Sequence, residues 1–268
     1  MLNISSPQNA KIKELVRLSS QKRERRLNGL FVVESAKLAQ EAALAGVVIR
    51  ELYRTPGAAE KYADLLVPAV AAAGQVVEIT QPVADRLAAS QTTQGVFALC
   101  ELPRPRIDPD RLPADGRYLL LSSLQDPGNI GAAIRSALAF GCDGLILSAD
   151  CPDLYSPKVL RAAMGGIFRL PVCVVPDMVS CITALRRRGV RVLAAALDRT
   201  ALTCGQAGLD RDGTAVVIGN EGSGLSPEVI AACDQTVFIP IAAESESLNA
   251  SVAASIFLWE MRRRPADR

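Results

Sequence analysis

The second half of the chain alternates short apolar segments with helical stretches, and this alternation restricts the fold more than any other feature. We expect buried strands at residues 118–122, 144–147, 171–175, 191–196, 215–218 and 237–239. Helices are expected between most of them, at residues 130–140, 156–164, 178–188 and 227–232. Apolar strands alternating with helices predict an α/β fold with a parallel sheet covered on both faces. Ligands in such folds bind beyond the carboxyl ends of the strands.

Residues 1–101 predict a separate, small α/β domain. It begins with a basic helix at 7–20 and a strand at 30–33, followed by a helix at 35–45. Strands near 49–53 and 76–79 flank a further helix, and a strand at 96–100 closes the unit. Prolines at 103, 105, 109 and 113 exclude a helix and indicate a semi-rigid linker at 102–116. The second domain is therefore expected at residues 117–268.

Residue usage excludes several mechanisms. The 268 residues include no histidine, which removes every Ser–His, Cys–His and His–metal arrangement. The seven cysteines are scattered without a C-x-x-C pair, so we expect buried free thiols and no metal site. No uncharged apolar run approaches the roughly 18 residues of a membrane span, and no signal peptide is visible. We expect a cytoplasmic protein without a membrane partner.

Three polar loops of the second domain contain the unusual residues. The first is QDPGNIG at 125–131, followed by a helix with Arg135; the second is GNEGSGL at 219–225. The third, residues 242–246, leads into Ser247 and Asn249, either of which can cap the final helix. Each has an ordinary structural interpretation as a turn, a surface arginine or a cap. Convergence of all three at one sheet edge favours a functional site.

The final helix, expected at 248–261, is apolar on nearly every face. Such a helix is usually buried in protein, so we expect it in a core or a subunit interface. At the other end of the chain, residues 11–26 carry a basic run that includes Lys22, Arg23, Arg25 and Arg26. This run is either a solvated helix face or a patch that contacts phosphates.

The three loops, in this order, resemble the SpoU (TrmH-like) family of RNA ribose 2′-O-methyltransferases, within the SPOUT superfamily. The resemblance covers about residues 117–262, through LQDPGNIGAAIRSALAFG, VIGNEGSGLSPEV and IPIAAESESLNASVAASIFLWE. SPKVLRAAMGGIFRLPV at 156–172 is also similar to the family. NAKIKELVRL, FVVES and TTQGVFAL resemble its accessory RNA-binding domain, which has a ribosomal-protein-like fold.

The resemblance implies methyl transfer from S-adenosylmethionine to a ribose 2′-hydroxyl of structured RNA, either rRNA or tRNA. It also implies a deep trefoil knot and a homodimer whose active site uses both subunits. Arg135 would be the central catalytic residue, with Asn129, Glu221, Ser247 and Asn249 around it. The cofactor would contact Ala196, Leu197, Gly219, Ile239 and Leu248. Departures from the family pattern are Ser35, Ala163, Ala243 and Ser245, at positions that affect the RNA side more than the chemistry.

The chemistry is consistent with this residue set. A sulfonium methyl is already activated, so the enzyme must align the reacting atoms and stabilise the developing alkoxide, without a metal. A guanidinium stays protonated and suits the second task. One alternative is an inactive RNA-binding or ribosome-assembly protein with the same fold. Another, a nicotinamide dehydrogenase, would need G-x-G-x-x-G after the first strand, and that glycine spacing is absent.

Overall fold

A computed structural model describes residues 2–89, 91–104, 107–198, 200–245 and 247–263. The chain forms two compact units: Met1–Arg104 together with Asp153–Phe168, and Pro105–Pro152 together with Arg169–Arg268. Pro105 of the predicted linker and Glu246 of the predicted polar loop lie outside the described residues. Across the part that is described, no helix combines the length and apolar character that crossing a membrane requires.

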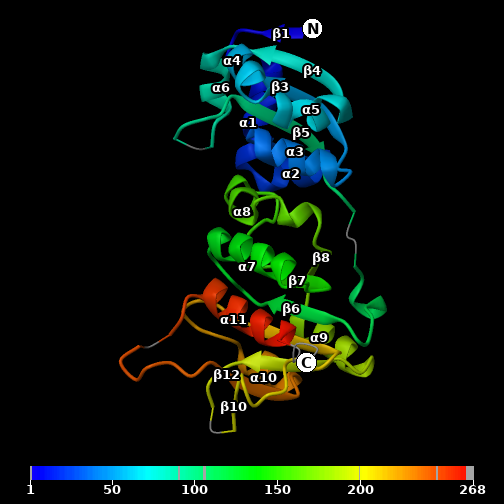
Figure 1. Cartoon of the computed structure of the whole chain (residues 1–268), viewed down its shortest axis with the longest axis vertical. Helices are drawn as coiled ribbons and strands as arrows, with labels where there is room; N and C mark the ends of the chain where they lie inside the picture. Colours follow the sequence, from blue (N-terminus) through cyan, green and yellow to red (C-terminus); the bar gives the residue numbers. More distant parts are fainter. Residues whose placement is uncertain (1, 90, 105–106, 199, 246, 264–268) are drawn as a thin grey trace. The chain divides into compact units, whose positions relative to one another are not determined.

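The first unit is built on a five-stranded mixed sheet in the order β1-β4-β3-β5-β2 (Figure 1). Its strands are β1 (Leu2–Ile4), β2 (Leu30–Glu34), β3 (Ile49–Arg54), β4 (Ala73–Ile79) and β5 (Val96–Glu101). Its first helices are α1 (Ala10–Ser20), α2 (Lys22–Asn28) and α3 (Ala36–Leu44), followed by α4 (Pro56–Lys61), α5 (Ala63–Ala72) and α6 (Gln81–Leu87). Helix α1 buries Ile12, Leu15 and Leu18 in the core because these positions share one helical face.

The segment Asp153–Phe168 leaves the second sheet and packs within the first unit. It contains α8 (Pro157–Ala163) and a 3₁₀ turn, η2 (Gly166–Phe168). Phe31 of β2 stacks against Tyr155 and Phe168, with ring centroids 4.8 and 6.2 Å away. The domain boundaries expected from the sequence assign this segment to the second domain. In the structure, the residues that it packs against belong to the first unit.

The second unit is a seven-stranded sheet in which every pairing is parallel, so the predicted α/β parallel-sheet fold is confirmed. The order is β10-β12-β9-β11-β6-β7-β8. The strands are β6 (Arg117–Leu121), β7 (Gly144–Ser148), β8 (Val172–Val175), β9 (Arg191–Ala195), β10 (Leu202–Thr203), β11 (Thr214–Ile218) and β12 (Gln235–Phe238). The helices are α7 (Pro127–Ala139), α9 (Met178–Arg187), α10 (Pro227–Ala232) and α11 (Ala250–Arg262).

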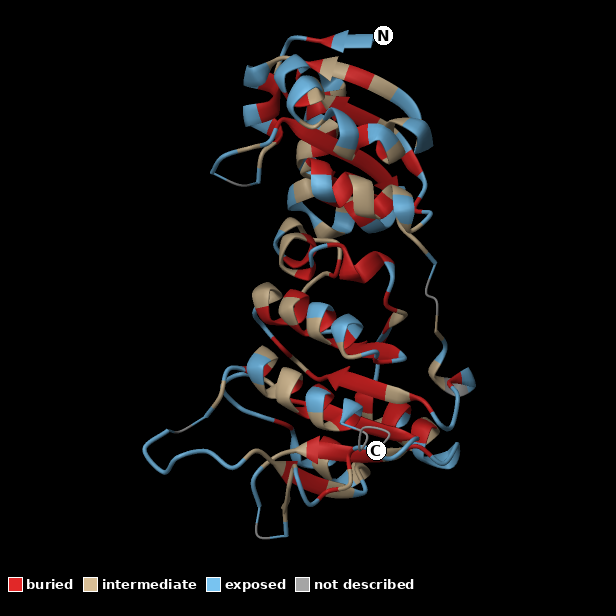
Figure 2. Cartoon of the chain, viewed as in Figure 1, coloured by how far each residue is buried: buried red, intermediate tan, exposed pale blue. Residues whose placement is uncertain are grey.

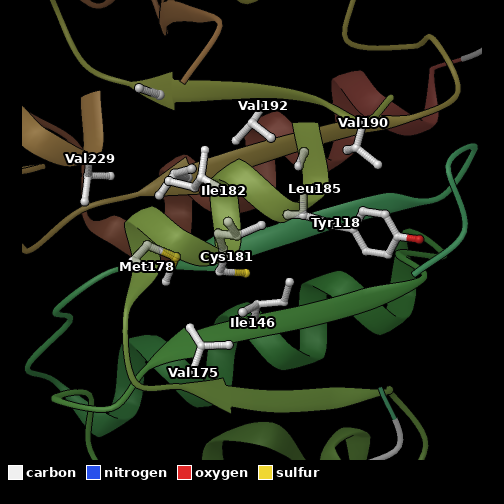
Figure 3. Packing of buried hydrophobic residues seen from close by; sticks show 14 of the residues in the cluster. Tyr118, Ile146, Val175, Met178, Cys181, Ile182, Leu185, Val190, Val192 and Val229 are labelled. Carbon is white, nitrogen blue, oxygen red and sulfur yellow. The ribbon is translucent and has the colours of Figure 1, made fainter. Parts of the chain in front are cut away.

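Helix α9 closes one face of this sheet. Its apolar side, with Cys181, Ile182 and Leu185, packs on Tyr118 of β6 and Val192 of β9, the strands on either side of β11 (Figure 3). The central strands β7 and β11 are buried at every position (Figure 2). Full burial of both faces explains why these strands are continuous apolar runs rather than alternating ones.

The second half of the predicted linker packs against the second unit. Leu112 is buried in the core, and its carbonyl accepts a hydrogen bond from Arg188 Nε at 2.6 Å. The Pro113 carbonyl accepts one from the Tyr118 hydroxyl at 2.7 Å. One 3₁₀ turn, η1 (Pro109–Arg111), forms here despite the prolines, because proline is tolerated in the first turn of a helix.

The structure bears on two further sequence expectations. Val252 and Trp259 of α11 are 47% and 52% exposed, so a single chain does not bury this helix completely, and the expected subunit interface stays a prediction. The cysteines are free thiols as expected, but Cys204 and Cys233 are only partly buried.

Candidate functional site

The loops that follow β6 and β11 meet because these two strands are neighbours in the parallel sheet. After β6 the chain enters α7 at Pro127, three residues earlier than the sequence pattern indicated. Asp126 is the N-cap, and its Oδ1 accepts a hydrogen bond from the Gly128 amide at 2.9 Å. Proline at the first helical position is favoured because its missing N–H has no partner there. Asn129 therefore lies in the first turn of a helix, not in a loop.

Glu221, from the loop after β11, binds the start of α7. Its Oε2 accepts from the Gln125 amide at 3.0 Å, and its Oε1 accepts from the Asp126 amide at 3.1 Å and from Asn129 Nδ2 at 2.9 Å. Partial burial alone would raise the pKa of Glu221. The hydrogen bonds from Asn129, Gln125 and Asp126 outweigh burial, and the pKa lies below its ordinary value.

Asn249 joins the third loop to this cluster. Its Nδ2 donates to Asn129 Oδ1 at 2.9 Å. Its Oδ1 accepts from the Ser251 and Val252 amides at 2.9 and 3.3 Å, so it is the N-cap of α11. The three loops singled out in the sequence are thus connected by the chain of hydrogen bonds Glu221–Asn129–Asn249.

The loop at residues 219–225 folds back on itself. Asn220 and Gly224 exchange two backbone hydrogen bonds of 3.0 Å, and Asn220 Nδ2 donates to the Ser123 carbonyl at 2.8 Å. A Cβ at Gly219 would lie 2.4 Å from the Gly224 carbonyl carbon, so only glycine fits. Gly219 therefore shapes the loop by close backbone packing.

An apolar cavity of about 210 Å³ lies beyond the ends of β9 and β12, against α11. Four of the five predicted cofactor-binding residues line it: Ala196, Leu197, Ile239 and Leu248. Ser247 also lines it. The remaining wall is formed by Ala195, Val237, Phe238, Ile241, Ala253 and Phe257. Gly219, the fifth predicted residue, is not part of the lining.

Arg135 stands apart from the Asn129 cluster. It is exposed on α7, and it makes no hydrogen bond or ion pair with any described residue. Six positions along a helix correspond to about 9 Å of rise and a rotation of roughly 240°, so Arg135 and Asn129 lie on different faces of α7. Within one chain, the predicted central residue therefore shares neither a hydrogen bond nor a helix face with Asn129.

The predicted RNA-binding residues lie on α2 of the first unit, and one of them is corrected. Arg23 and Arg26 are exposed and Lys22 is half-buried. Arg25 is only 3% exposed, and it ion-pairs with Asp153 at 2.5 Å and donates to the Leu18 and Ser19 carbonyls. Its guanidinium is therefore a structural group and is not available to a phosphate.

Several groups that shape the candidate site were not identified from the sequence. The Gln125 and Asp126 amides and the Asn220 side chain hold the loops together, and Ile241, Ala253 and Phe257 line the cavity. The Asp126–Pro127 pair was a usable signal, since it combines an N-cap with proline at the first helical position. In the described part of the chain, no group of three or more Cys, Asp or Glu side chains is arranged to hold a metal.

Comparisons with known proteins agree over nearly the whole chain. Residues 116–259 match the SpoU rRNA Methylase family, and residues 9–98 match the MRM3-like substrate binding domain. A 23S rRNA (guanosine(2553)-2′-O)-methyltransferase, RlmP, of Bacillus subtilis is 29% identical over 98% of this chain and 100% of its own. An AdoMet-bound rRNA methyltransferase from Sinorhizobium meliloti superposes with a TM-score of 0.86, at 27% identity, over 97% of both chains. The SpoU methyltransferase AviRb from Streptomyces viridochromogenes, solved with AdoMet, superposes with a TM-score of 0.84, at 28% identity, over 96% of this chain and 98% of its own.

Proposed function

The chain belongs to the SpoU rRNA methylase family, and on this premise we propose how its residues carry out the family's reaction. The protein is an S-adenosylmethionine-dependent methyltransferase that modifies a ribose 2′-hydroxyl of rRNA. The observation that carries the residue assignment is the hydrogen-bonded Glu221–Asn129–Asn249 chain, which connects the three loops of the site.

The apolar cavity between β9, β12 and α11 suits S-adenosylmethionine. Ile239 and Leu248 offer apolar walls, and the chain at Ala196 and Leu197 offers backbone groups that could bind an adenine edge. When bound, the cofactor supplies a methyl group on a positively charged sulfur. Gly219 contributes indirectly, by keeping the neighbouring loop in its folded-back form.

Arg135 is proposed to stabilise the alkoxide that develops on the 2′-oxygen. It carries a permanent positive charge, is exposed, and has no described partner that would compete for its guanidinium. Removal of one such charge-stabilising donor typically costs about 10²–10³ in rate. A guanidinium does not accept protons at neutral pH, so the proton of the hydroxyl goes to water or to a substrate phosphate.

The other site residues are proposed to position the loops. Glu221 and Asn249 both bond to Asn129, which fixes the start of α7 relative to the start of α11. Ser247 lines the cavity directly before Leu248 and Asn249, where it can contact substrate or cofactor.

A homodimer that completes the site is part of the proposal. The α7–α11 surface exposes Leu138, Val252 and Trp259, and Leu138 lies one turn after Arg135 on α7. Because Arg135 is on a different face from Asn129, it can act on the cofactor of a second copy more readily than on its own. The trefoil knot belongs to the same proposal, supported by the return of the chain after β12 to pack α11 on α7, β6 and β11.

The first unit is proposed to bind the RNA. Its match to a substrate-binding domain supports this role for residues 1–101, with 102–116 as linker and 117–268 as the methyltransferase domain. Lys22, Arg23 and Arg26 are the candidate phosphate contacts. The cytoplasmic location expected from the sequence is kept as part of this proposal, because rRNA is the substrate.

The test is a methyl-transfer assay with purified protein, labelled S-adenosylmethionine and rRNA from a strain that lacks the gene. We expect label on a ribose 2′-oxygen, mapped by mass spectrometry of nuclease fragments. Label on a base would overturn the reaction assignment. Binding of cofactor and RNA with no transfer to any nucleotide would instead support the alternative, an inactive RNA-binding protein.

A further inference from the structure

A second crevice opens at the same edge of the parallel sheet, and its residues differ from those of the cofactor cavity. It measures about 590 Å³ and lies beyond the ends of β6, β7 and β8, between the starts of α9 and α10. This volume is within the range of small-molecule pockets, roughly 300–1,000 Å³. None of its lining residues lines the apolar cavity.

Polar groups at the base of the crevice form a small network around Asp150. Ser148 Oγ accepts from the Ser123 amide at 2.8 Å and donates to Asp150 Oδ1 at 2.5 Å. Hydrogen bonds from the Ser123 and Ser148 side chains lower the pKa of Asp150, so it stays ionised at neutral pH. Asp150 itself is exposed, which leaves the carboxylate free to accept further hydrogen bonds.

Ser122 adds a hydroxyl group to the crevice. It is only 7% exposed, it lines the crevice, and its hydroxyl bonds to no residue that the structure describes. A hydroxyl that lines a cavity and has no protein partner is free to donate to, and accept from, a ligand. Ser122 directly follows β6, in the segment that leads into α7 and Asn129, so a ligand here would lie next to the catalytic loops.

The remaining lining selects the kind of ligand. Met178, Leu225 and Val229 provide apolar walls, and none of the described residues that line the crevice is a lysine or an arginine. A phosphate would therefore meet the Asp150 and Asp177 carboxylates without a compensating positive charge. A flat, uncharged group with N–H donors on its edge fits, and a nucleobase has both properties.

The arrangement of hydrogen-bond donors on the Watson–Crick edge distinguishes the four bases. The Watson–Crick edge of guanine presents adjacent N1–H and N2–H groups, which a carboxylate can accept together. Uracil presents one N–H between two carbonyl oxygens, which a carboxylate repels, and cytosine and adenine present an amino group next to a ring acceptor. We propose, on the basis of the rRNA substrate given above, that this crevice binds an unstacked guanine of the RNA, with Asp150 and Ser122 as its specificity-determining residues.

The experiment measures base preference in short single strands, with the full chain. Uridine hexamers that carry guanine, inosine or cytosine at one internal position are compared with the all-uridine strand by fluorescence anisotropy. We expect the guanine strand to bind about tenfold more tightly than all-uridine, as one bidentate base contact typically gives. Inosine lacks the 2-amino group, so its strand should lose most of that preference. Equal affinity for all strands, or a cytosine strand as tight as the guanine strand, would overturn the assignment.

Variants separate base reading from folding. Asp150→Asn and Ser122→Ala should each reduce the guanine preference while the affinity for the all-uridine strand stays unchanged. Asp210→Asn, an exposed aspartate of the same unit, is the matched control and should keep the preference. Saturating S-adenosylhomocysteine should leave the guanine preference of the wild-type protein intact. Loss of the preference under that condition would assign the crevice to the cofactor instead.

The outcome is independent of the methyl-transfer assay. A protein that methylates rRNA ribose but shows no base preference would keep the proposed function and refute the guanine site. A protein that shows the Asp150-dependent preference without methyl transfer would keep the guanine site and refute the proposed reaction.

Discussion

Asn129 Nδ2 donates a hydrogen bond of 2.9 Å to Glu221 Oε1, although the two residues are 92 positions apart in the chain. Asn129 Oδ1 simultaneously accepts from Asn249, which fixes the orientation of the amide group. One side chain therefore connects the loop after β11 to the start of α11 through the first turn of α7. Any motion of one loop must break a hydrogen bond with another.

Glu221 should make the stability of the second unit depend on pH. Its pKa is lowered in the folded state, so ionised Glu221 stabilises the fold above the pKa of the unfolded chain, near 4.5. That contribution is lost as the pH falls through the lower, folded-state pKa. We expect Glu221→Gln to reduce the urea midpoint relative to wild type by a constant amount between pH 7 and 5. The gap should shrink below pH 4.5, and a gap that widens in acid would contradict the assignment.

Strands buried on both faces were predictable, whereas elements without an apolar pattern were not. Residues of β7 and β11 are continuous apolar runs, which identify central parallel strands. Helix α2, with the sequence KRERRLN, buries only Arg25 and has no apolar periodicity. Strand β1 at the sheet edge is too short, and too exposed, to give a signal.

The residues of the site were predictable by type, but their arrangement required the folded chain. The burial of Arg25 depends on Asp153, 128 positions later, and no local pattern reports such a pair. The separation of Arg135 from Asn129 depends on where α7 begins and on which face packs against α11. For the exposed Trp259 the sequence predicts either a core or a subunit interface, because it does not distinguish a core from a surface that a second copy would cover.

Arg135→Ala should lower the rate of methyl transfer by about 10²–10³ while leaving cofactor affinity nearly unchanged. The reason is that Arg135 is outside the cavity lining and is assigned to the transition state. Single-turnover kinetics with rRNA and calorimetry with S-adenosylmethionine measure the two steps separately. Arg135→Lys keeps a positive charge and should retain part of the rate; an alanine variant at wild-type speed would refute the role.

Activity should return when two inactive variants form mixed dimers. Arg135→Ala removes the arginine, and Ile239→Arg fills the cofactor cavity with a charged side chain. If Arg135 serves the partner's cofactor, each mixed dimer has one intact site. Random assembly then gives about a quarter of wild-type activity. Two differently tagged variants, co-expressed and assayed as a mixture, test this; no recovery would place Arg135 at the cofactor site of its own chain.

Ser35→Gly should stabilise the first unit. Ser35 has φ of 112°, a region that favours glycine, although its Oγ caps α3 by accepting from the Leu38 amide at 3.2 Å. Strain at such a residue costs on the order of 1–3 kcal/mol, while exchanging a serine cap for glycine costs only a few tenths. After the larger chain entropy of glycine is subtracted, we expect a gain of about 1 kcal/mol. Ser35→Ala keeps the strain and loses the cap, so urea denaturation should rank glycine above serine and serine above alanine.

The last prediction concerns the basic surface of α2. Lys22, Arg23 and Arg26 are free to contact phosphates, whereas Arg25 is held by Asp153 and by two backbone carbonyls. Glutamine at the three accessible positions should weaken RNA binding across sequences, because phosphate contacts position the RNA without specifying it. The slope of log affinity against log salt should flatten by about 0.7–0.9 for each contact removed. Arg25 is left unchanged, because breaking a buried ion pair costs about 3–5 kcal/mol and would confuse unfolding with lost binding.

Filter binding at several salt concentrations, with wild type and the triple variant side by side, measures both effects. Exposed Lys61 and Arg86, replaced by glutamine, serve as the control on other helices of the same unit, with two positive charges removed against three in the triple variant. We expect the control to keep the wild-type slope. That result would show that a general loss of positive charge does not cause the flatter slope of the triple variant. Cofactor affinity should be the same in all three proteins, since the cavity is built from the second unit. If the triple variant also keeps the wild-type slope, α2 is a solvated face and the RNA phosphates bind elsewhere.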